Sequence, residues 1–515
     1  MLKSSGAMGI ATLTSRVFGM VREMVYARFM GDSWVASAFI MALTIPNLFR
    51  RLLGEGALTA AFIPIFKIKE KTEGEAAMWR ASNAVISGLI VAAAAVTGLA
   101  MLGVSGALMS KSWSEETRLM LQLLRVMFPY MTLACLAAVF MGMLNSRGYF
   151  FIPAMGATVL NWVAIASVLW LAPRFGQTLS TQIFGVAAGM LMAGVAQAAF
   201  QLPALHREGY RYAWISPWGN DVVREVVRKM IPGAIGVAAF QINIVLTQSI
   251  SFWVGSQIVA SFNYAVRLME LPQGVFGISL ATFLLPTLSG MAAEKKYDEF
   301  RATLGQGLGY LCYVNLWASA MLIVLAEPII RLLFERGAFT AFSTDRASFA
   351  LACLAPGLVS FSVVNILARA FYALGDIKTP MKTSIVCLGL NLVFTIPLVL
   401  AFEQGGLGIA NTLSSLFNVW FLFFGLRKKL KWLGLEQLRS RFFLMLAATL
   451  FAGQLAWLAL RLWDRWWGHA NLFLKLGEVF VPMGIATVAY WGATLAMKIP
   501  QAREVLNVAR KRLGR

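Results

Sequence analysis

The chain has 515 residues, of which 59% are hydrophobic and only 13% are charged. Soluble domains carry about 25% charged residues, so this composition excludes an ordinary soluble globular protein. The net charge of +21 does not by itself indicate a nucleic-acid partner, because basic residues also accumulate in the cytoplasmic loops of membrane proteins. Apolar runs long enough to span a bilayer recur along almost the whole chain, and they predict an all-α polytopic membrane protein.

Fourteen apolar segments are predicted to be transmembrane helices. They form a predicted N-terminal six-helix lobe (1–205), a cytoplasmic linker (206–226), a C-terminal six-helix lobe (227–426), and two additional helices followed by a basic tail (427–515). In chain order the segments are residues 7–30, 33–53, 82–107, 119–146, 152–173, 180–204, 227–254, 258–290, 303–326, 346–374, 380–402, 405–426, 440–463 and 472–497.

The first predicted helix is unusual because it carries charges inside an apolar run. Its residues 12–28 read TLTSRVFGMVREMVYAR. On a helical wheel at about 100° per residue, Arg16, Arg22 and Glu23 share one polar sector about 120° wide. A charge at the bilayer centre costs at least ~2.5–3.5 kcal/mol, so this sector is predicted to face a wet cavity. The alternative is an internal salt bridge between Glu23 and one of the arginines, holding two helices together.

Later predicted helices add further arginines. Arg50 and Arg51 end the second helix in PNLFRRLLGEG, and Arg267 and Glu270 lie in YAVRLMELP. Basic residues within a few positions of a span end are counted with the nearer loop, except Arg28, Arg369 and Lys475. Seven basic residues then remain within the predicted spans against three acids, which leaves an excess of positive charge. The three acids are Glu23, Glu270 and Glu478. Because guanidinium groups bind phosphate oxygens in a bidentate manner, this excess predicts a central cavity for a polyanionic head group. Snorkelling of single arginines to the membrane interface is the alternative for Arg50 and Arg51.

The spacing of prolines indicates an internal repeat. Pro129 and Pro153 are 24 residues apart, as are Pro356 and Pro380, and the two pairs are offset by 227 residues. Six spans per repeat return the chain to the same side of the membrane, which predicts parallel repeats around a central cavity. The last two helices have no counterpart. A transporter working by alternating access is the expected function of such a bundle, and a purely structural bundle is the alternative.

The distribution of basic residues predicts that both termini are cytoplasmic. With the N-terminus inside, 30 of the 45 lysines and arginines lie on the cytoplasmic side, 8 lie outside and 7 lie within spans. No removable signal peptide is expected. The cysteines are predicted to be small core residues, because each lies singly within an apolar run. They are Cys135, Cys312, Cys353 and Cys387.

The sequence contains no motif for covalent chemistry, so we do not expect an enzyme. There is no GxxxxGK[ST] motif for a nucleotide, and no nucleophile–base pair lies within a span. His206 and His469 lie in predicted loops without metal-ligand spacing, so neither a metal nor another cofactor is expected. The energy for transport would come from an ion gradient, the membrane potential or the gradient of the substrate.

Several motifs resemble those of the MviN family of bacterial lipid II flippases, within the multidrug/oligosaccharidyl-lipid/polysaccharide exporter superfamily. The resemblance extends from about residue 4 to the last predicted span. The motifs are TSRVFGMVRE, IPNLFRRLLGEGALTAAFIP, RLMELPQGVFGISLATFLLP, FERGAFT and RAFYALGDIKTP.

This resemblance implies that the chain moves lipid II, the undecaprenyl-diphosphate-linked disaccharide-pentapeptide precursor of peptidoglycan. Transport would run from the inner to the outer leaflet of the bacterial inner membrane, in a monomer surrounded by membrane lipids. The two additional helices would form a groove for the undecaprenyl tail. The resemblance also implies substrate-binding roles for Ser15, Arg16, Arg22, Asn47, Arg50, Glu55, Arg267 and Glu270.

Two positions depart from the pattern of the family. Ser37 stands where many members have aspartate, so no carboxylate role is expected there. Some members bind sodium through aspartate and asparagine, but Asn243 and Asn391 have no aspartate partner within the spans. We therefore predict that these two amides pack helices together.

Three alternative functions remain open from the sequence. The nearest is a flippase for another undecaprenyl-diphosphate-linked glycan. A drug/cation antiporter of the same superfamily would need acids in its cavity rather than an excess of arginine. A membrane scaffold for cell-wall enzymes would tolerate free replacement of the cavity arginines.

Overall fold

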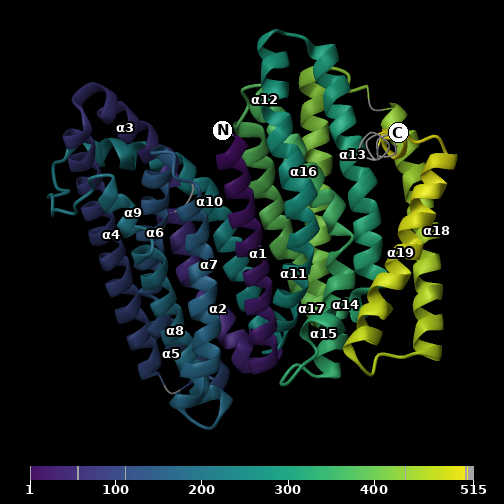
Figure 1. Ribbon diagram of the computed structural model, residues 1–515, viewed down its shortest axis with the longest axis horizontal. Helices are drawn as coiled ribbons and strands as arrows, with labels where there is room; N and C mark the ends of the chain where they lie inside the picture. The colour runs from purple at the N-terminus through teal and green to yellow at the C-terminus, as the bar shows by residue number, and fades with distance from the viewer. Residues whose placement is uncertain (1, 55–56, 111, 435, 505–506, 508–515) are drawn as a thin grey trace. The chain divides into compact units, whose positions relative to one another are not determined.

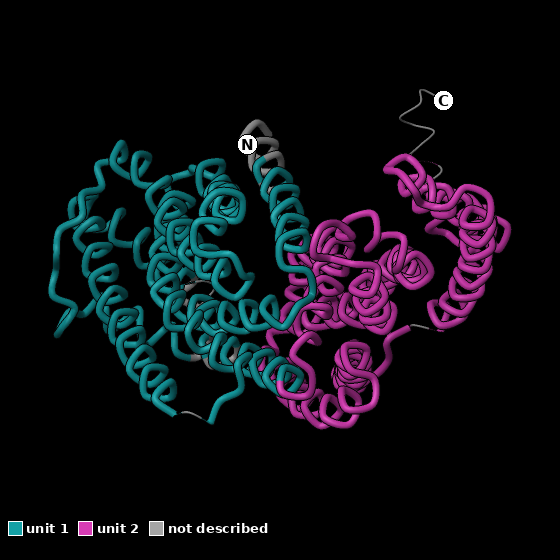
Figure 2. The backbone as a smooth tube through the Cα atoms, turned by 90° about the horizontal axis from the view of Figure 1, so that it is seen from below, with its two compact units in different colours: residues 1–252 teal, residues 253–515 magenta. Residues whose placement is uncertain are grey.

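The computed structural model describes residues 2–54, 57–110, 112–434, 436–504 and 507, and every regular element in these ranges is helical. The chain divides into two compact units, Met1–Phe252 and Trp253–Arg515, which Figure 2 colours teal and magenta. The all-α polytopic class predicted from the composition is therefore confirmed.

Among its described residues, unit 1 contains ten helices and two short helical segments labelled η (Figure 1). The last helix, α10, extends two residues beyond the boundary of the unit. In chain order the elements are α1 (Leu2–Met30), α2 (Trp34–Leu53), α3 (Ala57–Glu73), α4 (Glu75–Met109), α5 (Glu115–Met127), α6 (Tyr130–Ser146), α7 (Phe151–Ala166), η1 (Ser167–Leu171), η2 (Ala172–Phe175), α8 (Leu179–Ala199), α9 (Leu202–Arg207) and α10 (Asp221–Val254).

Unit 2 contains the remaining helices and one π-helical segment, η3, which continues α11 into α12. In chain order the elements are α11 (Ile258–Pro272), η3 (Gln273–Ile278), α12 (Ser279–Ala293), α13 (Tyr297–Val324), α14 (Ala326–Phe334), α15 (Ala341–Leu354), α16 (Gly357–Ala373), α17 (Lys378–Leu430), α18 (Glu436–Trp466) and α19 (Leu472–Ala496).

The helices account for the fourteen predicted segments. Within the described ranges, ten helical stretches are long and apolar enough to cross a membrane, and two bent helix pairs raise this number to twelve. One of the ten, the 53-residue α17, is two helices joined at Glu403, whose backbone is not helical. This break falls between the predicted segments 380–402 and 405–426. The charged helix α1 corresponds to the first predicted segment.

Two helices, α3 and α14, were not predicted, because neither contains an apolar run of membrane-spanning length. α3 ends in the charged sequence KIKEKTE, where Lys67 pairs with Glu70 at 2.7 Å and Lys69 pairs with Glu73 one turn away. Such pairs stabilise a helix that apolarity alone does not indicate. α14 has only nine residues, although its Phe334 side chain is fully buried.

The bent pairs agree with the duplication predicted from proline spacing. α5 and α6 meet at an angle of 44° next to Pro129, and α15 and α16 meet at the same angle next to Pro356. Proline lacks the backbone N–H needed to continue a helical ladder, so it favours a bend at each position. Both units therefore contain the same bent element at the equivalent proline.

The two additional helices, α18 and α19, pack against the rest of unit 2 through small residues. Ala448, Ala452 and Ala456 recur every four residues on α18 and are fully buried in a cluster shared with α13 and α19. Small side chains allow membrane helices to approach closely. The hydroxyl of Tyr490 on α19 also donates to the carbonyl of Tyr313 on α13 at 2.7 Å. The pair α18–α19 is thus an integral part of unit 2 (Figure 1).

Candidate functional site

Arg22 on α1 is bound within unit 1. It donates to Oε1 of Glu23 at 2.5 Å and to Oδ1 of Asn161 on α7 at 3.1 Å. Its guanidinium also lies 5.7 Å from the ring centroid of Tyr26. The side chains of Arg22 and Glu23 are 20% and 7% exposed. Because both charges are largely covered and paired, this contact contributes to helix packing as well as to the charge of α1.

Asn161 is the residue that connects this ion pair to a second helix. Its amide oxygen accepts from Arg22, and its Nδ2 donates to the backbone carbonyl of Ser15 at 3.3 Å. Asn161 therefore contacts α1 at two positions almost two turns apart. Asn161 was not among the predicted site residues. The signal in the sequence was a single amide residue within the apolar segment 152–173, and amides in such segments commonly join membrane helices. In the structure Asn161 is buried.

Arg16 has different surroundings from Arg22, although a helical wheel places both in one polar sector. The Arg16 side chain is exposed, whereas that of Arg22 is mostly covered. Arg16 is consequently the more accessible of these two arginines.

The second predicted group lies at the end of α2. The Nε of Arg50 donates to Oδ1 of Asn47 at 3.1 Å, so these residues support each other on one helix face. Glu55 lies outside the described residues. A Cβ at Gly54 would lie 2.8 Å from the Cα of Cys135 on α6, which explains why this position needs glycine. Ser37, earlier on α2, is fully buried.

Arg267 and Glu270 lie one turn apart on α11, in unit 2. Their side chains are 38% and 53% exposed, and the Nη1–Oε2 distance is 3.0 Å. An exposed pair of this type contributes about 0.2–1 kcal/mol in water. The ion pair with Glu270 by itself therefore opposes the binding of a multiply charged anion only weakly.

Asn391 belongs to a contact between the two halves of α17. Its Nδ2 donates to Oδ1 of Asn411 at 3.5 Å, and Asn411 in turn donates to the carbonyl of Leu407 at 2.8 Å. The Asn391–Asn411 contact is of the kind expected for amides that pack helices. Asn243 is buried on α10, where its backbone carbonyl accepts from the hydroxyl of Thr247 on the same helix at 2.9 Å, and the packing role of its side chain stays a prediction.

A cluster around Arg147 closes one end of unit 1. Arg147 follows α6 and donates to Glu70 on α3, to Glu75 on α4 at 2.8 Å, and to Glu208 after α9 at 2.7 Å. Tyr149 donates to the other oxygen of Glu208 at 2.8 Å. The hydrogen bond from Arg147, followed by that from Tyr149, lowers the pKa of Glu208 below its ordinary value. Arg147 therefore joins three segments that lie outside the predicted membrane spans.

The motif RAFYALGDIKTP forms a helix cap in unit 2. The Asp376 carboxylate accepts from the backbone N–H of Thr379 at 3.0 Å and from its hydroxyl at 2.7 Å. Lys429, at the other end of α17, lies 2.8 Å from Asp376. The hydrogen bonds from Lys429 and then Thr379 lower the pKa of Asp376. This motif thus fixes both ends of α17.

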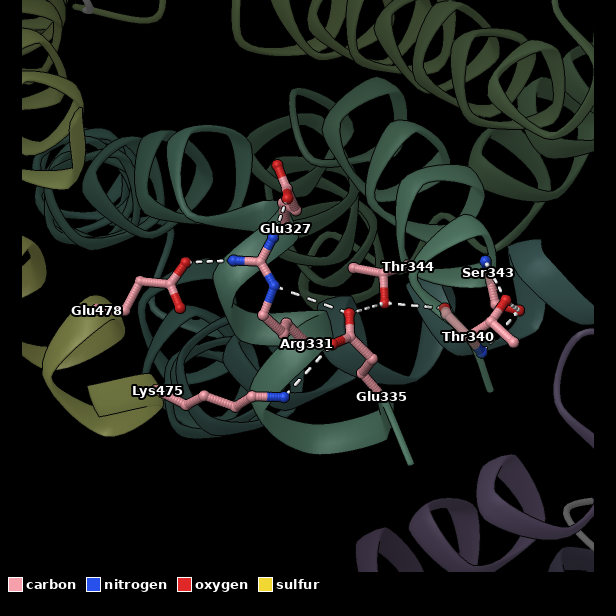
Figure 3. Close-up of polar contacts among 8 residues, drawn as sticks. All are labelled: Glu327, Arg331, Glu335, Thr340, Ser343, Thr344, Lys475 and Glu478. Atoms are coloured by element: carbon pink, nitrogen blue, oxygen red, sulfur yellow. Dashed lines mark hydrogen bonds and ion pairs between the residues drawn. The ribbon is translucent and has the colours of Figure 1, made fainter. Parts of the chain in front are cut away.

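A third charged cluster surrounds Arg331 on α14 (Figure 3). Arg331 donates to Glu478 on α19 and to Glu327 on its own helix, and its Nε lies 3.7 Å from Glu335. Lys475 on α19 also reaches Glu335, at 3.4 Å. Arg331 lies between the predicted segments 303–326 and 346–374, and Glu478 lies within the predicted segment 472–497. The structure places them in direct contact between α14 and α19.

Comparison with known proteins identifies the family. A sequence model described as "Lipid II flippase MurJ" matches residues 26–477. A Burkholderia cenocepacia protein with the same description is 32% identical over 471 residues, which are 87% of this chain and 88% of the relative. A Haemophilus influenzae protein named "Probable lipid II flippase MurJ" is 30% identical over 508 residues, covering 94% and 98% of the two chains.

Solved structures share the fold. A lipid II flippase MurJ in its inward closed conformation superposes with a TM-score of 0.77 at 22% identity, covering 95% of this chain and 99% of its own. An inward-facing multidrug resistance transporter of the MATE family, in the MOP superfamily, gives 0.66 at 14% identity, covering 82% and 98%. With the sequence matches above, the conclusion is direct: the chain belongs to the MurJ family of lipid II flippases.

Proposed function

We propose that this protein moves lipid II from the inner to the outer leaflet of the bacterial inner membrane by alternating access. The observation that carries this proposal is the family match over residues 26–477, which includes most of the helices of both units. Membership of this family makes the chain a multi-pass membrane transporter rather than an enzyme.

The diphosphate of lipid II is the part of the substrate that the arginines suit best. In our proposal Arg16, Arg22 and Arg267 contact it, since planar guanidinium groups bind phosphate oxygens through two parallel hydrogen bonds. The exposure of Arg16 and the weak pairing of Arg267 support this role. The remaining proposed contacts to the substrate come from Ser15, Asn47, Arg50, Glu55 and Glu270.

The undecaprenyl tail would lie against α18 and α19 in this proposal. Both helices carry large apolar side chains on their outer surfaces, among them Phe451 and Trp457 on α18 and Phe480 and Ile485 on α19. An isoprenoid chain is stable only in apolar surroundings. An apolar helix surface therefore suits the tail, while the head group would cross the membrane along a different path.

A cationic-drug exporter fits the charges less well. Two of the three acids predicted within the spans are bound to arginine, since Glu23 contacts Arg22 and Glu478 contacts Arg331. The third, Glu270, is paired with Arg267. An exporter of cations needs carboxylates that can bind its substrate, and here each carboxylate has a cationic neighbour.

Lipid binding to the purified full-length protein tests the proposed substrate. Native mass spectrometry would compare lipid II with undecaprenyl diphosphate, which lacks the glycan and peptide, and with phosphatidylglycerol. We expect lipid II to be retained at concentrations at which neither competitor is bound. Equal retention of all three lipids would show general anion binding and would overturn the assignment of the substrate.

We also propose that both termini are cytoplasmic, which predicts opposite labelling of two loops. Ser216 precedes α10 and Ala338 lies between α14 and α15, and both are exposed. In a background without native cysteines, Ala338→Cys should react with an impermeant maleimide in intact cells, and Ser216→Cys only after permeabilisation. Ser343→Cys is the matched control, because Ser343 is buried in the cap of α15 and should not react. The reverse labelling pattern would contradict the orientation.

A further inference from the structure

The cluster around Arg331 brings several acids together in a basic chain. Four acids lie in or beside it, together with Arg331 and Lys475, and Arg461 and Arg465 flank Asp464 in the sequence. Carboxylate oxygens are ligands for metal cations. The four acids are Glu327, Glu335, Asp464 and Glu478.

Glu478 provides a buried acceptor without a partner. The residue is fully buried, its Oε1 accepts from Arg331, and its Oε2 has no hydrogen-bond partner among the described residues. Figure 3 shows Arg331 reaching one oxygen of Glu478 while the other points away from the guanidinium. A buried carboxylate oxygen without a partner is costly, so this atom indicates a missing cationic or donor group.

The hairpin between α18 and α19 brings two further ligands to the carboxylate of Glu478. A carboxylate oxygen of Asp464, a ring nitrogen of His469 and a carboxylate oxygen of Glu478 all lie within 4.8 Å of one another. The hairpin is tightly packed, because a Cβ on Gly477 would lie 2.1 Å from the Trp463 ring. Asp464 and Glu478 follow these two residues directly, so their juxtaposition results from the packing of the helices.

We propose that Asp464, His469 and Glu478 bind a divalent transition-metal ion of the Zn²⁺ class. Imidazole nitrogen and carboxylate oxygen both bind Zn²⁺, and three protein ligands leave a fourth position for water. The imidazole nitrogen favours such an ion over Mg²⁺ or Ca²⁺, which prefer oxygen ligands. Metal–ligand distances of about 2.0–2.2 Å require the ligand atoms to approach more closely, and the exposed side chains of Asp464 and His469 can adjust.

Arg331 would then orient the buried Glu478 carboxylate through the oxygen that does not bind the metal ion. A carboxylate that binds a metal through one oxygen is commonly fixed by a hydrogen bond to the other, and Arg331 supplies that bond to Glu478. The ion would connect the end of α18 to the start of α19, and Arg331 would connect both to α14. The proposed site is independent of lipid II binding and does not depend on the proposed function.

Zinc binding by the full-length protein, purified without a histidine tag, tests this proposal. The protein is first treated with EDTA and dialysed, and ZnCl₂ is then added during calorimetric titration and thermal melting. His469→Ala is the primary variant, because His469 is exposed and its removal leaves the Arg331–Glu478 pair intact. His206→Ala is the matched control, because it removes the only other histidine of the chain.

We expect one Zn²⁺ per chain and a higher melting temperature in the wild type and in His206→Ala. His469→Ala should bind Zn²⁺ at least tenfold more weakly and lose the increase in melting temperature. Asp464→Asn should weaken binding in the same direction. Absence of Zn²⁺ binding by the wild type, or equal binding by wild type and His469→Ala, would overturn the proposal and leave the cluster as an ion-pair network only.

Discussion

Replacing Arg331 by methionine is expected to lower the free energy of unfolding by about 3–5 kcal/mol, because it leaves a buried carboxylate without its guanidinium. The side chains of Arg331 and Glu478 are only 11% and 1% exposed, so water cannot replace the lost contact. Methionine keeps much of the apolar stem of arginine, and the effect is therefore mainly electrostatic. Thermal and denaturant unfolding of the full-length protein in detergent with EDTA would measure it.

Two further variants identify the cause of this loss. Arg331→Met combined with Glu478→Gln should recover most of the stability, because the stranded charge is removed with its partner. Arg336→Met is the control on the same segment. Its side chain is exposed and donates to the Leu332 carbonyl at 3.0 Å, so a change within about 0.5 kcal/mol is expected. An Arg331→Met protein that unfolds like the wild type would contradict this account of the cluster.

Arg22→Met is expected to produce a loss of similar size in unit 1, about 3–5 kcal/mol. The variant removes the guanidinium from Glu23, which is almost completely covered, and it also removes the contact to Asn161. Adding Glu23→Gln should restore most of the melting temperature. Arg16→Met is the matched control on the same helix, because Arg16 is exposed and its replacement should leave unfolding nearly unchanged. Equal stability of the Arg22 and Arg16 variants would contradict a packing role for Arg22.

Local patterns were sufficient to predict the membrane-spanning part of the fold. In lipid, a run of about 20 apolar residues can form all its backbone hydrogen bonds only as a helix. The apolar runs were therefore sufficient to predict the fourteen segments. The prolines of the repeat were equally informative about the fold, because the missing backbone N–H of a proline bends the helix in which the proline lies. The bends next to Pro129 and Pro356 are the direct structural result.

Contacts between distant residues could not be predicted in this way. Asn161 lies 139 residues from Arg22, and Glu478 lies 147 residues from Arg331. No periodicity links such positions, since their proximity depends on how helices pack. For the same reason the spacing of Asp464, His469 and Glu478 resembles no standard metal motif, although the hairpin brings their ligand atoms together.

The helical wheel shows what a pattern can and cannot determine. It grouped Arg16, Arg22 and Glu23 in one sector of α1, because the direction of a side chain follows from helix geometry. It could not show that α7 covers Arg22 through Asn161 while Arg16 remains exposed. Replacement of Arg16 is therefore expected to affect transport with little effect on stability, whereas replacement of Arg22 is expected to affect both.

The central claim is tested most directly by measuring lipid II at the outer surface of cells depleted of their own flippase. An impermeant reagent that modifies lipid II would report its arrival in the outer leaflet. We predict that the wild-type chain restores modification, whereas Arg16→Ala and the stable double variant Arg22→Met/Glu23→Gln reduce it at least tenfold at equal membrane levels, since each lost charge-assisted contact is worth roughly 1.5–3 kcal/mol. A wild-type protein that is fully inserted in the membrane but leaves lipid II in the inner leaflet would contradict the account.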